Sequence, residues 1–180
     1  MNIFYLHEDP KQCAEWMVDR HVVKMILETA QLLSTAHRVL DGHLTEQQVS
    51  INGVHKKVKL WKLDNSWRDD TLYKATHINH PSAIWARKSL ANYRWLYQHL
   101  EALLDEYTYR YGKTHKCQSL CDALKFPPLN IPIDSFTQPT VAMDPSFIIS
   151  DDAVLNYQNY YKHGKKHLFH WTKRQQPDWL

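Results

Sequence analysis

The segment from Asp19 to Leu33 constrains the fold of this chain more than any other feature. Drawn as a helix at about 100° per residue, it gathers its polar side chains after Asp19 on a stripe about 100° wide. The rest of its circumference is almost entirely apolar, which is typical of a buried helix. The sequence therefore predicts a helix that is buried except for one narrow polar stripe. That stripe consists of Arg20, His21, Lys24, Glu28 and Gln31.

Two explanations of this stripe are open. Charged side chains are rarely buried unless they are paired or functional. Lys24 and Glu28 are four residues apart, so the stripe can be an ion pair that faces water and stabilises the helix by roughly 0.3–0.5 kcal/mol. The other explanation is that the stripe lines a cleft and carries out chemistry there. Its narrowness favours the cleft.

Size and composition limit the class of protein. A chain of 180 residues fits one domain, 1–180, and the 43% hydrophobic content with seven Trp excludes a disordered chain. The apolar runs are too short for a membrane helix, and the first residues lack the basic start and apolar core of a signal peptide. Three Cys, an odd number, suit free thiols in a reducing compartment. We therefore expect a cytoplasmic protein with no membrane partner.

Helix-start signals divide the chain into a short extended arm, residues 2–6, and three long helices. Asp9 before Pro10 is a favourable N-cap, His80 before Pro81 is another start, and Ser150 opens an acidic first turn. Apolar side chains recur at helical spacing after each start. The helices are predicted to span about residues 10–40, 82–112 and 150–171.

Two segments between these helices are predicted to be non-helical. Residues 44–64 are expected to form a hairpin insert, because Asn52-Gly53 lies between short β-prone runs. The lysines of this insert would make it either a basic β-ribbon or a solvated surface hairpin. Five prolines within residues 125–149 predict an extended Pro-rich connection. The expected fold is a mostly α, single-domain helical bundle with one small β-hairpin and a Pro-rich crossing segment.

Two other polar segments supply further candidate substrate-binding residues. One spans residues 76–87, and the other is the aromatic and basic C-terminal segment, residues 157–174. Aromatic side chains interleaved with cations suit phosphate contacts and base stacking, although cations also decorate the ends of ordinary helices. A net charge of +3 permits a nucleic-acid partner without requiring one. Together with Arg20 and Gln31 of the stripe, the candidates are Asn79, His80, Trp85, Arg87, Lys166, His167 and Arg174.

Metal and cofactor binding are not expected. The chain has twelve His, but neither the His77/His80 pair nor the His115, Cys117 and Cys121 group matches a defined zinc spacing. The chain has only four Gly, and it lacks the Gly-rich loops that cradle phosphates or dinucleotides. The sequence therefore predicts no metal and no cofactor.

The polar motifs resemble two signatures of a known family. The Asp-x-His-x-x-Lys-x-x-x-Glu-x-x-Gln motif at residues 19–31 follows a short extended N-terminus. It is similar to the first helix of pyrimidine dimer DNA glycosylases of the endonuclease V type, which are small bacterial and phage proteins. Asn-His-Pro at residues 79–81, followed by Trp85, is similar to their second signature, which opens a long aromatic-rich helix. The resemblance leaves the hairpin and the C-terminal third unexplained.

The resemblance implies a helical enzyme that flips a base out of DNA and cleaves its bond to the sugar. In the endonuclease V mechanism a primary amine attacks the sugar C1′ and forms a Schiff base, while a glutamate stabilises the developing charge. The founding enzyme uses the α-amine of a processed N-terminal threonine, whereas residue 2 of this chain is Asn. Three alternatives follow: the nucleophile is the α-amine of Met1, it is the side-chain amine of Lys24, or the chain has no lyase chemistry. The candidate catalytic residues are Lys24, Glu28 and His21.

The leading hypothesis is a DNA base-excision or base-processing enzyme of the glycosylase/AP-lyase type that acts on damaged or modified pyrimidines. A second is a non-catalytic, phage-type protein that sequesters a nucleotide or nucleic acid with the same stripe. A third is an enzyme acting on free nucleotides or hypermodified thymine, and a fourth is an interaction protein whose stripe is coincidental. The first three have DNA or a nucleotide as partner, in the host cytoplasm if the chain is phage-encoded. The oligomeric state is left open.

Overall fold

The structure is a computed structural model that describes residues 1–51 and 54–180. The predicted Asn52-Gly53 turn and the side chains at positions 49, 51, 54 and 56 lie outside this description. The expectation of a mostly α fold with one small hairpin is confirmed. The α-helices and strands are α1 Pro10–Trp16, α2 Asp19–Asp41, β1 His43–Ile51, β2 Val54–Lys62, α3 Ser66–Thr71, α4 Pro81–Ala86, α5 Leu90–Tyr111, α6 Cys121–Leu124 and α7 Ala153–Gly164, with short 3-10 helices η1 Lys116–Leu120, η2 Pro145–Phe147 and η3 Lys166–Leu168.

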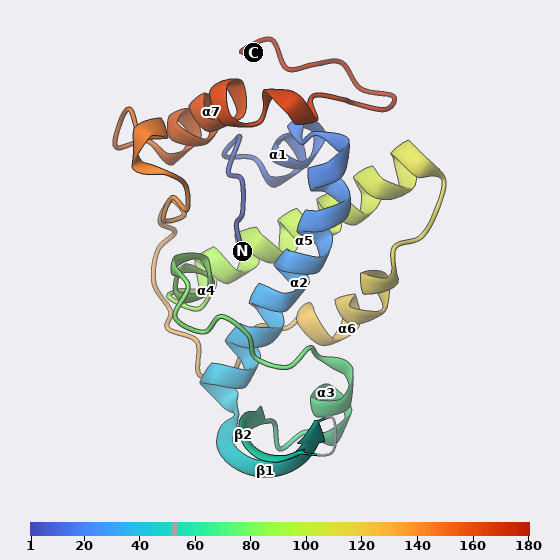
Figure 1. The fold of residues 1–180 in the computed structure, drawn as a ribbon, viewed down its shortest axis with the longest axis vertical. Helices are drawn as coiled ribbons and strands as arrows, with labels where there is room; N and C mark the ends of the chain where they lie inside the picture. The colour runs from blue at the N-terminus through green and yellow to red at the C-terminus, as the bar shows by residue number, and fades with distance from the viewer. Residues whose placement is uncertain (52–53) are drawn as a thin grey trace.

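Helix α2 runs along the long axis of the molecule and organises the other elements (Figure 1). It packs against α5 and α4, and α1 packs against α5. Helix α7 lies at one end of the molecule and the antiparallel β1–β2 sheet at the other, while the N-terminal arm ends near the middle (Figure 1). The buried side of α2 supplies much of the core, as its apolar circumference predicts.

The first predicted helix, 10–40, is wrong in one respect, because the chain is extended at Met17 and Val18 between α1 and α2. The reason lies far along the sequence. The fully buried guanidinium of Arg110 donates hydrogen bonds to the carbonyl oxygens of Glu15 and Met17, both at 2.9 Å. Because Arg110 satisfies these carbonyl oxygens, they need no backbone N–H from a following helical turn, and α1 can end here.

The other two predicted helices are also shorter than expected. The helix over 82–112 is interrupted at Ser89, whose hydroxyl accepts a hydrogen bond from the backbone N–H of Asn92 at 3.1 Å and so caps α5. The backbone N–H of Leu90 donates to Pro132 in the Pro-rich connection at 2.8 Å. The predicted helix over 150–171 spans only Ala153–Gly164 and is followed by η3. Helical periodicity alone does not predict the break between α4 and α5, because the break depends on the Ser89 cap and on the distant carbonyl of Pro132.

Arg38, near the end of α2, fixes the base of the hairpin. Its side chain is fully buried and donates to the backbone carbonyls of Trp61, Asp69, Leu72 and Tyr73 at 2.6 to 2.8 Å. It also pairs with the carboxylate of Asp69. One guanidinium therefore binds the end of β2 and the whole turn after α3 to the main helix.

Gly42 connects α2 to β1 at a point of close approach. A Cβ at this position would lie 2.8 Å from the carbonyl oxygen of Lys62 and closer still to that of Arg38. Only glycine leaves room for both carbonyls, which lets the first residue of the hairpin follow the helix directly.

Two buried histidines, His37 on α2 and His99 on α5, are held in the neutral form. The His37 ring lies 2.9 Å from the Tyr93 hydroxyl, which itself donates to the carbonyl oxygen of Leu124, so His37 Nε2 carries the proton. His99 Nδ1 donates to the carbonyl of Pro10 at 3.0 Å. The second ring nitrogen of each has no partner among the described residues. Burial lowers the pKa of both rings from 6.5 to about 4.

These histidines predict that the protein loses stability in mildly acidic solution. Below pH 6.5 the unfolded chain takes up protons at both rings that the folded protein does not bind until about pH 4. The free energy of unfolding should therefore fall as the pH decreases, by about 2 kcal/mol per histidine at pH 5. Urea denaturation at pH 7.5, 6 and 5 measures this. His37→Gln should reduce the slope and His55→Gln, on the exposed hairpin, should not; equal stability at pH 7.5 and 5 would contradict the prediction.

Candidate active site

Glu28 lies at the centre of the polar stripe on α2. One carboxylate oxygen accepts a hydrogen bond from the backbone N–H of Asn2 at 2.8 Å, and the other lies 3.3 Å from the ammonium nitrogen of Lys24. The side chain of Glu28 is 13% exposed, whereas that of Lys24 is 68% exposed. The ion pair considered in the sequence analysis therefore forms, but its carboxylate also binds the N-terminal arm, as a purely solvated pair would not.

The arm that reaches Glu28 has no regular secondary structure, has a left-handed backbone at Phe4 with φ of 55°, and is buried from Ile3 to Leu6. Its first residues are fixed by side chains rather than by a sheet. Asn2 donates from Nδ2 to the carbonyl oxygen of Ala142, and its Oδ1 accepts a hydrogen bond from the Tyr157 hydroxyl, both at 2.7 Å. The Pro-rich connection and α7 thus hold the backbone nitrogen of residue 2 against the carboxylate of α2.

His21 lies one turn before Lys24 and is 5% exposed. The Phe4 ring stacks on its imidazole with centroids 4.1 Å apart, and Nδ1 contacts the hydroxyl of Tyr161. Burial, followed by the positive charges of Lys165 and Lys24, lowers the pKa of His21 from 6.5 to about 3. Burial also keeps Tyr161 a neutral phenol by raising its pKa. The phenol is then the donor to Nδ1, and His21 is a neutral ring that carries its proton on Nε2.

The C-terminal end of α7 adds positive charge to this region. The ammonium nitrogen of Lys165 lies 4.7 Å from the centroid of the Tyr160 ring and 5.9 Å from that of Phe4. His167, a predicted site residue, is close enough to act on the pKa of His21. Lys166, predicted with it, is exposed, and its neighbour Lys165 lies over the aromatic rings instead. The sequence located this cationic segment, but not which lysine faces the site.

The Asn79-His80-Pro81 turn contributes a second histidine. His80 caps α4, since its Nδ1 accepts the backbone N–H of Ser82 at 3.2 Å. Burial lowers its pKa, the N-terminal amine and His77 add to this effect, and Glu28 opposes it. The N-terminal amine and the carboxylate of Glu28 are therefore close enough to His80 to affect its pKa. Asn79, next to it, is exposed.

Trp85 on α4 and Arg87 directly after this helix have different surroundings. Trp85 is 2% exposed, its indole N–H donates to the carbonyl of Thr137 at 2.8 Å, and its ring packs edge-on against Trp95 and Phe136. Its ring is therefore packed in the core of this structure, and its role as a substrate contact stays a prediction. Arg87 is half-buried, and its Nη1 has no hydrogen-bond partner among the described residues.

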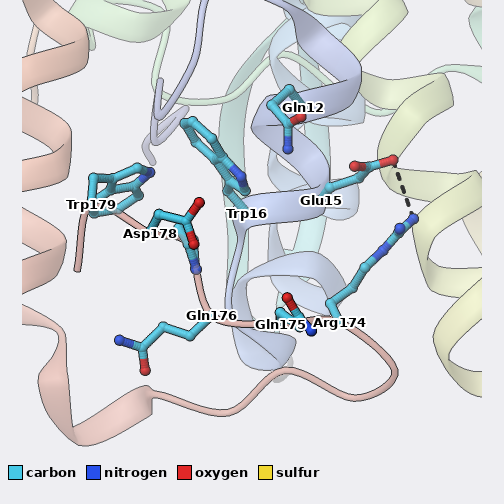
Figure 2. Close-up of a pocket in the computed structure, with 9 residues that line it drawn as sticks. Gln12, Glu15, Trp16, Arg174, Gln175, Gln176, Asp178 and Trp179 are labelled. Carbon is cyan, nitrogen blue, oxygen red and sulfur yellow. Dashed lines mark hydrogen bonds and ion pairs between the residues drawn. The ribbon is translucent and has the colours of Figure 1, made fainter.

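Arg174 is not brought together with the stripe. Figure 2 shows it in a cavity of about 410 Å³ between α1 and the C-terminal tail, where it pairs with Glu15 at 3.2 Å. It also pairs with the buried carboxylate of Glu106 at 2.8 Å, which in turn binds Arg110. Arg174 thus extends the ion-pair network that ends α1, and its role as a substrate contact stays a prediction.

The candidate active site thus consists of His21, Lys24 and Glu28 on α2, the arm at Asn2, the His80 turn and Lys165 after α7. Arg20, exposed, and Gln31, half-buried, belong to the stripe on α2 but make no side-chain contact that defines a role. Within residues 1–51 and 54–180 no three His, Cys, Asp or Glu side chains are grouped to hold a metal ion. Among the helices of the same residues, none is long and apolar enough to cross a membrane.

Comparison with known protein families assigns the chain to one of them. A family model described as pyrimidine dimer DNA glycosylase matches residues 1–119. The chain belongs to this family. The match confirms the resemblance that the motifs at 19–31 and 79–81 indicate, and it implies that the substrate is DNA. Neither the curated proteins nor the solved structures gave a significant match.

The part of the chain that matches the glycosylase family holds the stripe of α2, the N-terminal arm and the His80 turn. The residues that complete the site from α7 follow after the match. Tyr161 and Lys165 were missed by the sequence analysis as individual site residues, although both lie in the aromatic and basic C-terminal segment. Their spacing of four residues, which puts them on one face of a helix, is the signal that could have found them.

Proposed function

We propose that this chain is a DNA base-excision enzyme of the glycosylase/AP-lyase type that acts on damaged or modified pyrimidines. The observation that carries the proposal is the carboxylate of Glu28, which lies between the backbone nitrogen of residue 2 at 2.8 Å and the side-chain amine of Lys24 at 3.3 Å. A carboxylate beside a candidate amine is what attack on a sugar C1′ requires, because positive charge develops on the sugar as the base leaves.

In the proposed reaction, the bond between C1′ and the base is replaced by a bond between C1′ and an amine nitrogen. A neutral amine attacks C1′, and the bond to the base breaks with its electron pair, which leaves on the base together with a proton. The bond between C1′ and the ring oxygen then breaks, the ring oxygen takes up the second proton of the amine, and an imine remains between the amine nitrogen and C1′. Glu28 stabilises the charge on the sugar, and the Nε2–H of His21 is available as a neutral donor to a phosphate or sugar oxygen.

Two amines fit this role. The first is Lys24, whose nitrogen already contacts Glu28. The second is the α-amine, which lies at Met1, one peptide unit from the nitrogen that binds Glu28, or at that nitrogen itself if Met1 is removed. Both alternatives retain Glu28 as the charge-stabilising group, so they share one test.

Borohydride trapping on a duplex with an abasic site, and on UV-irradiated duplex, tests the proposal. Borohydride reduces the imine to a stable secondary amine, so we expect a covalent protein–DNA adduct. Peptide mapping of the adduct by mass spectrometry identifies the amine. Lys24→Ala should abolish the adduct if Lys24 is the nucleophile and preserve it if the α-amine is; Lys11→Ala, an exposed lysine on α1, is the matched control. The absence of any adduct, with tight DNA binding retained, would overturn the proposal in favour of a non-catalytic DNA-binding protein.

A further inference from the structure

A groove of about 310 Å³ separates the β-hairpin from the segment that leads to the His80 turn. One side is formed by Leu44 of β1 with Lys59 and Trp61 of β2, and the other by residues 75–78. The groove lies outside the site described above, and nothing in the proposed chemistry uses it. Its walls combine apolar surface with a cation at the rim.

The two faces of the hairpin differ in what they present to this groove. Alternate residues of a strand point to opposite faces, so Lys57 shares the groove face with Lys59 and Trp61, whereas Lys62 points to the opposite face. Lys57 and Lys59 are both exposed, and one acidic residue, Glu46, pairs opposite Lys59 in the register. The groove face is therefore a cationic surface with an aromatic ring at its base.

The segment that forms the far side of the groove packs against α2. Thr35, two turns after Glu28, accepts a hydrogen bond from the backbone N–H of Thr76 at 3.2 Å, so the segment beyond the groove rests on the same side of the helix. His77, which lines the groove, has a left-handed backbone with φ of 48° and acts on the pKa of His80. The buried Thr35 thus fixes residues 75–78 to α2, and these residues in turn line the groove beside the hairpin.

The distance from Glu28 to the hairpin along α2 can be expressed in base pairs of a DNA duplex. Glu28 and Asp41, where α2 ends next to the hairpin, are separated by 13 residues, or about 20 Å of helix at 1.5 Å per residue. A duplex rises 3.4 Å per base pair, so this span corresponds to about six base pairs. A duplex whose modified base lies at Glu28 would pass the hairpin about half a helical turn away.

We propose that the groove and the Lys57–Lys59 face bind the phosphate backbone of duplex DNA about six base pairs to one side of the processed base. This inference rests on the proposed function for the position of that base. Exposed lysines bind phosphates by releasing counterions, a contribution that does not depend on the base sequence. Leu44 and Trp61 offer apolar surface to the sugars between those phosphates. Arg38 and Gly42 hold the hairpin in place for this contact.

The test compares Lys59→Ala with Lys62→Ala, which removes an equal charge from the opposite face of the same strand. Binding to an abasic-site duplex with ten base pairs on each side is measured as a function of salt. Lys59→Ala should weaken binding by about threefold to tenfold and lower the slope of log K against log salt by about one. Lys62→Ala should change neither. Shortening the flank on one side to three base pairs should remove the difference, and shortening the other should not.

The outcome is separable from that of the proposed function, because the adduct yield at saturating protein is measured with the same variants. Lys59 does not contact Glu28, so Lys59→Ala should trap as much DNA at saturation as the natural protein. An adduct with no difference between the two variants would overturn the hairpin contact alone. A one-sided effect of Lys59 without an adduct would support the contact and overturn the chemistry. If the natural protein fails to bind the duplex, the hairpin contact is overturned too.

Discussion

Glu28→Gln is expected to lower the rate of adduct formation on a UV-irradiated duplex by about 10³-fold. Glutamine preserves the size of the side chain and an oxygen that can accept the Asn2 N–H, so the N-terminal arm should stay in place. What it removes is the negative charge that faces the sugar as the base leaves. The rate is measured under single-turnover conditions at saturating protein, so that weaker binding does not contribute.

Stability distinguishes loss of chemistry from loss of fold in this variant. The ion pair with Lys24 involves a side chain that is 68% exposed, and such pairs contribute less than about 0.5 kcal/mol. The free energy of unfolding should therefore change by less than about 0.5 kcal/mol. Glu101→Gln, an exposed position on α5, is the matched control and should retain full activity. Full activity of Glu28→Gln would remove Glu28 from the mechanism.

Arg38→Met should have the largest effect on stability, a loss of about 3–5 kcal/mol in the free energy of unfolding. Methionine fills part of the volume but leaves four backbone carbonyls and the Asp69 carboxylate without their donor. Polar groups deprived of a partner in a buried position account for the size of the loss. Urea denaturation followed by circular dichroism measures it.

Arg20→Met is the control for this experiment, because it removes the same functional group from an exposed position on the same helix. It should change the free energy of unfolding by less than about 0.5 kcal/mol. A loss of under about 1 kcal/mol for Arg38→Met would show that these hydrogen bonds do not determine stability. A large loss limited to the amide protection of β1, β2 and α3 would locate the effect in the hairpin end of the molecule.

The sequence predicted the features that depend on neighbouring residues. Local periodicity and turn chemistry predict the stripe on α2, the capping residues Asp9 and His80 and the presence of a hairpin, and the structure contains all of these elements. The same reasoning reached the part of the site that lies on one helix, because Lys24 and Glu28 are four residues apart. These features need no knowledge of how distant segments meet.

The sequence failed where distant side chains decide the outcome. The break at Met17 depends on Arg110, more than ninety residues away, and the neutral form of His21 depends on its burial and on Tyr161. Trp85 was predicted to contact a base because its place in the sequence does not show that Trp95 and Phe136 pack against its ring. Arg174 looked like a phosphate contact because its carboxylate partners, Glu15 and Glu106, lie far away in the sequence.

The inward course of the N-terminal arm has a practical consequence for work with this protein. Met1 lies near the middle of the molecule, next to the carboxylate of Glu28, while the opposite terminus lies at the outer end by α7 (Figure 1). An affinity tag fused before Met1 would therefore place extra residues beside Glu28, and it would turn the α-amine into an amide. A tag placed after Leu180 leaves the α-amine and the surroundings of Glu28 unchanged, so that end suits the trapping experiment.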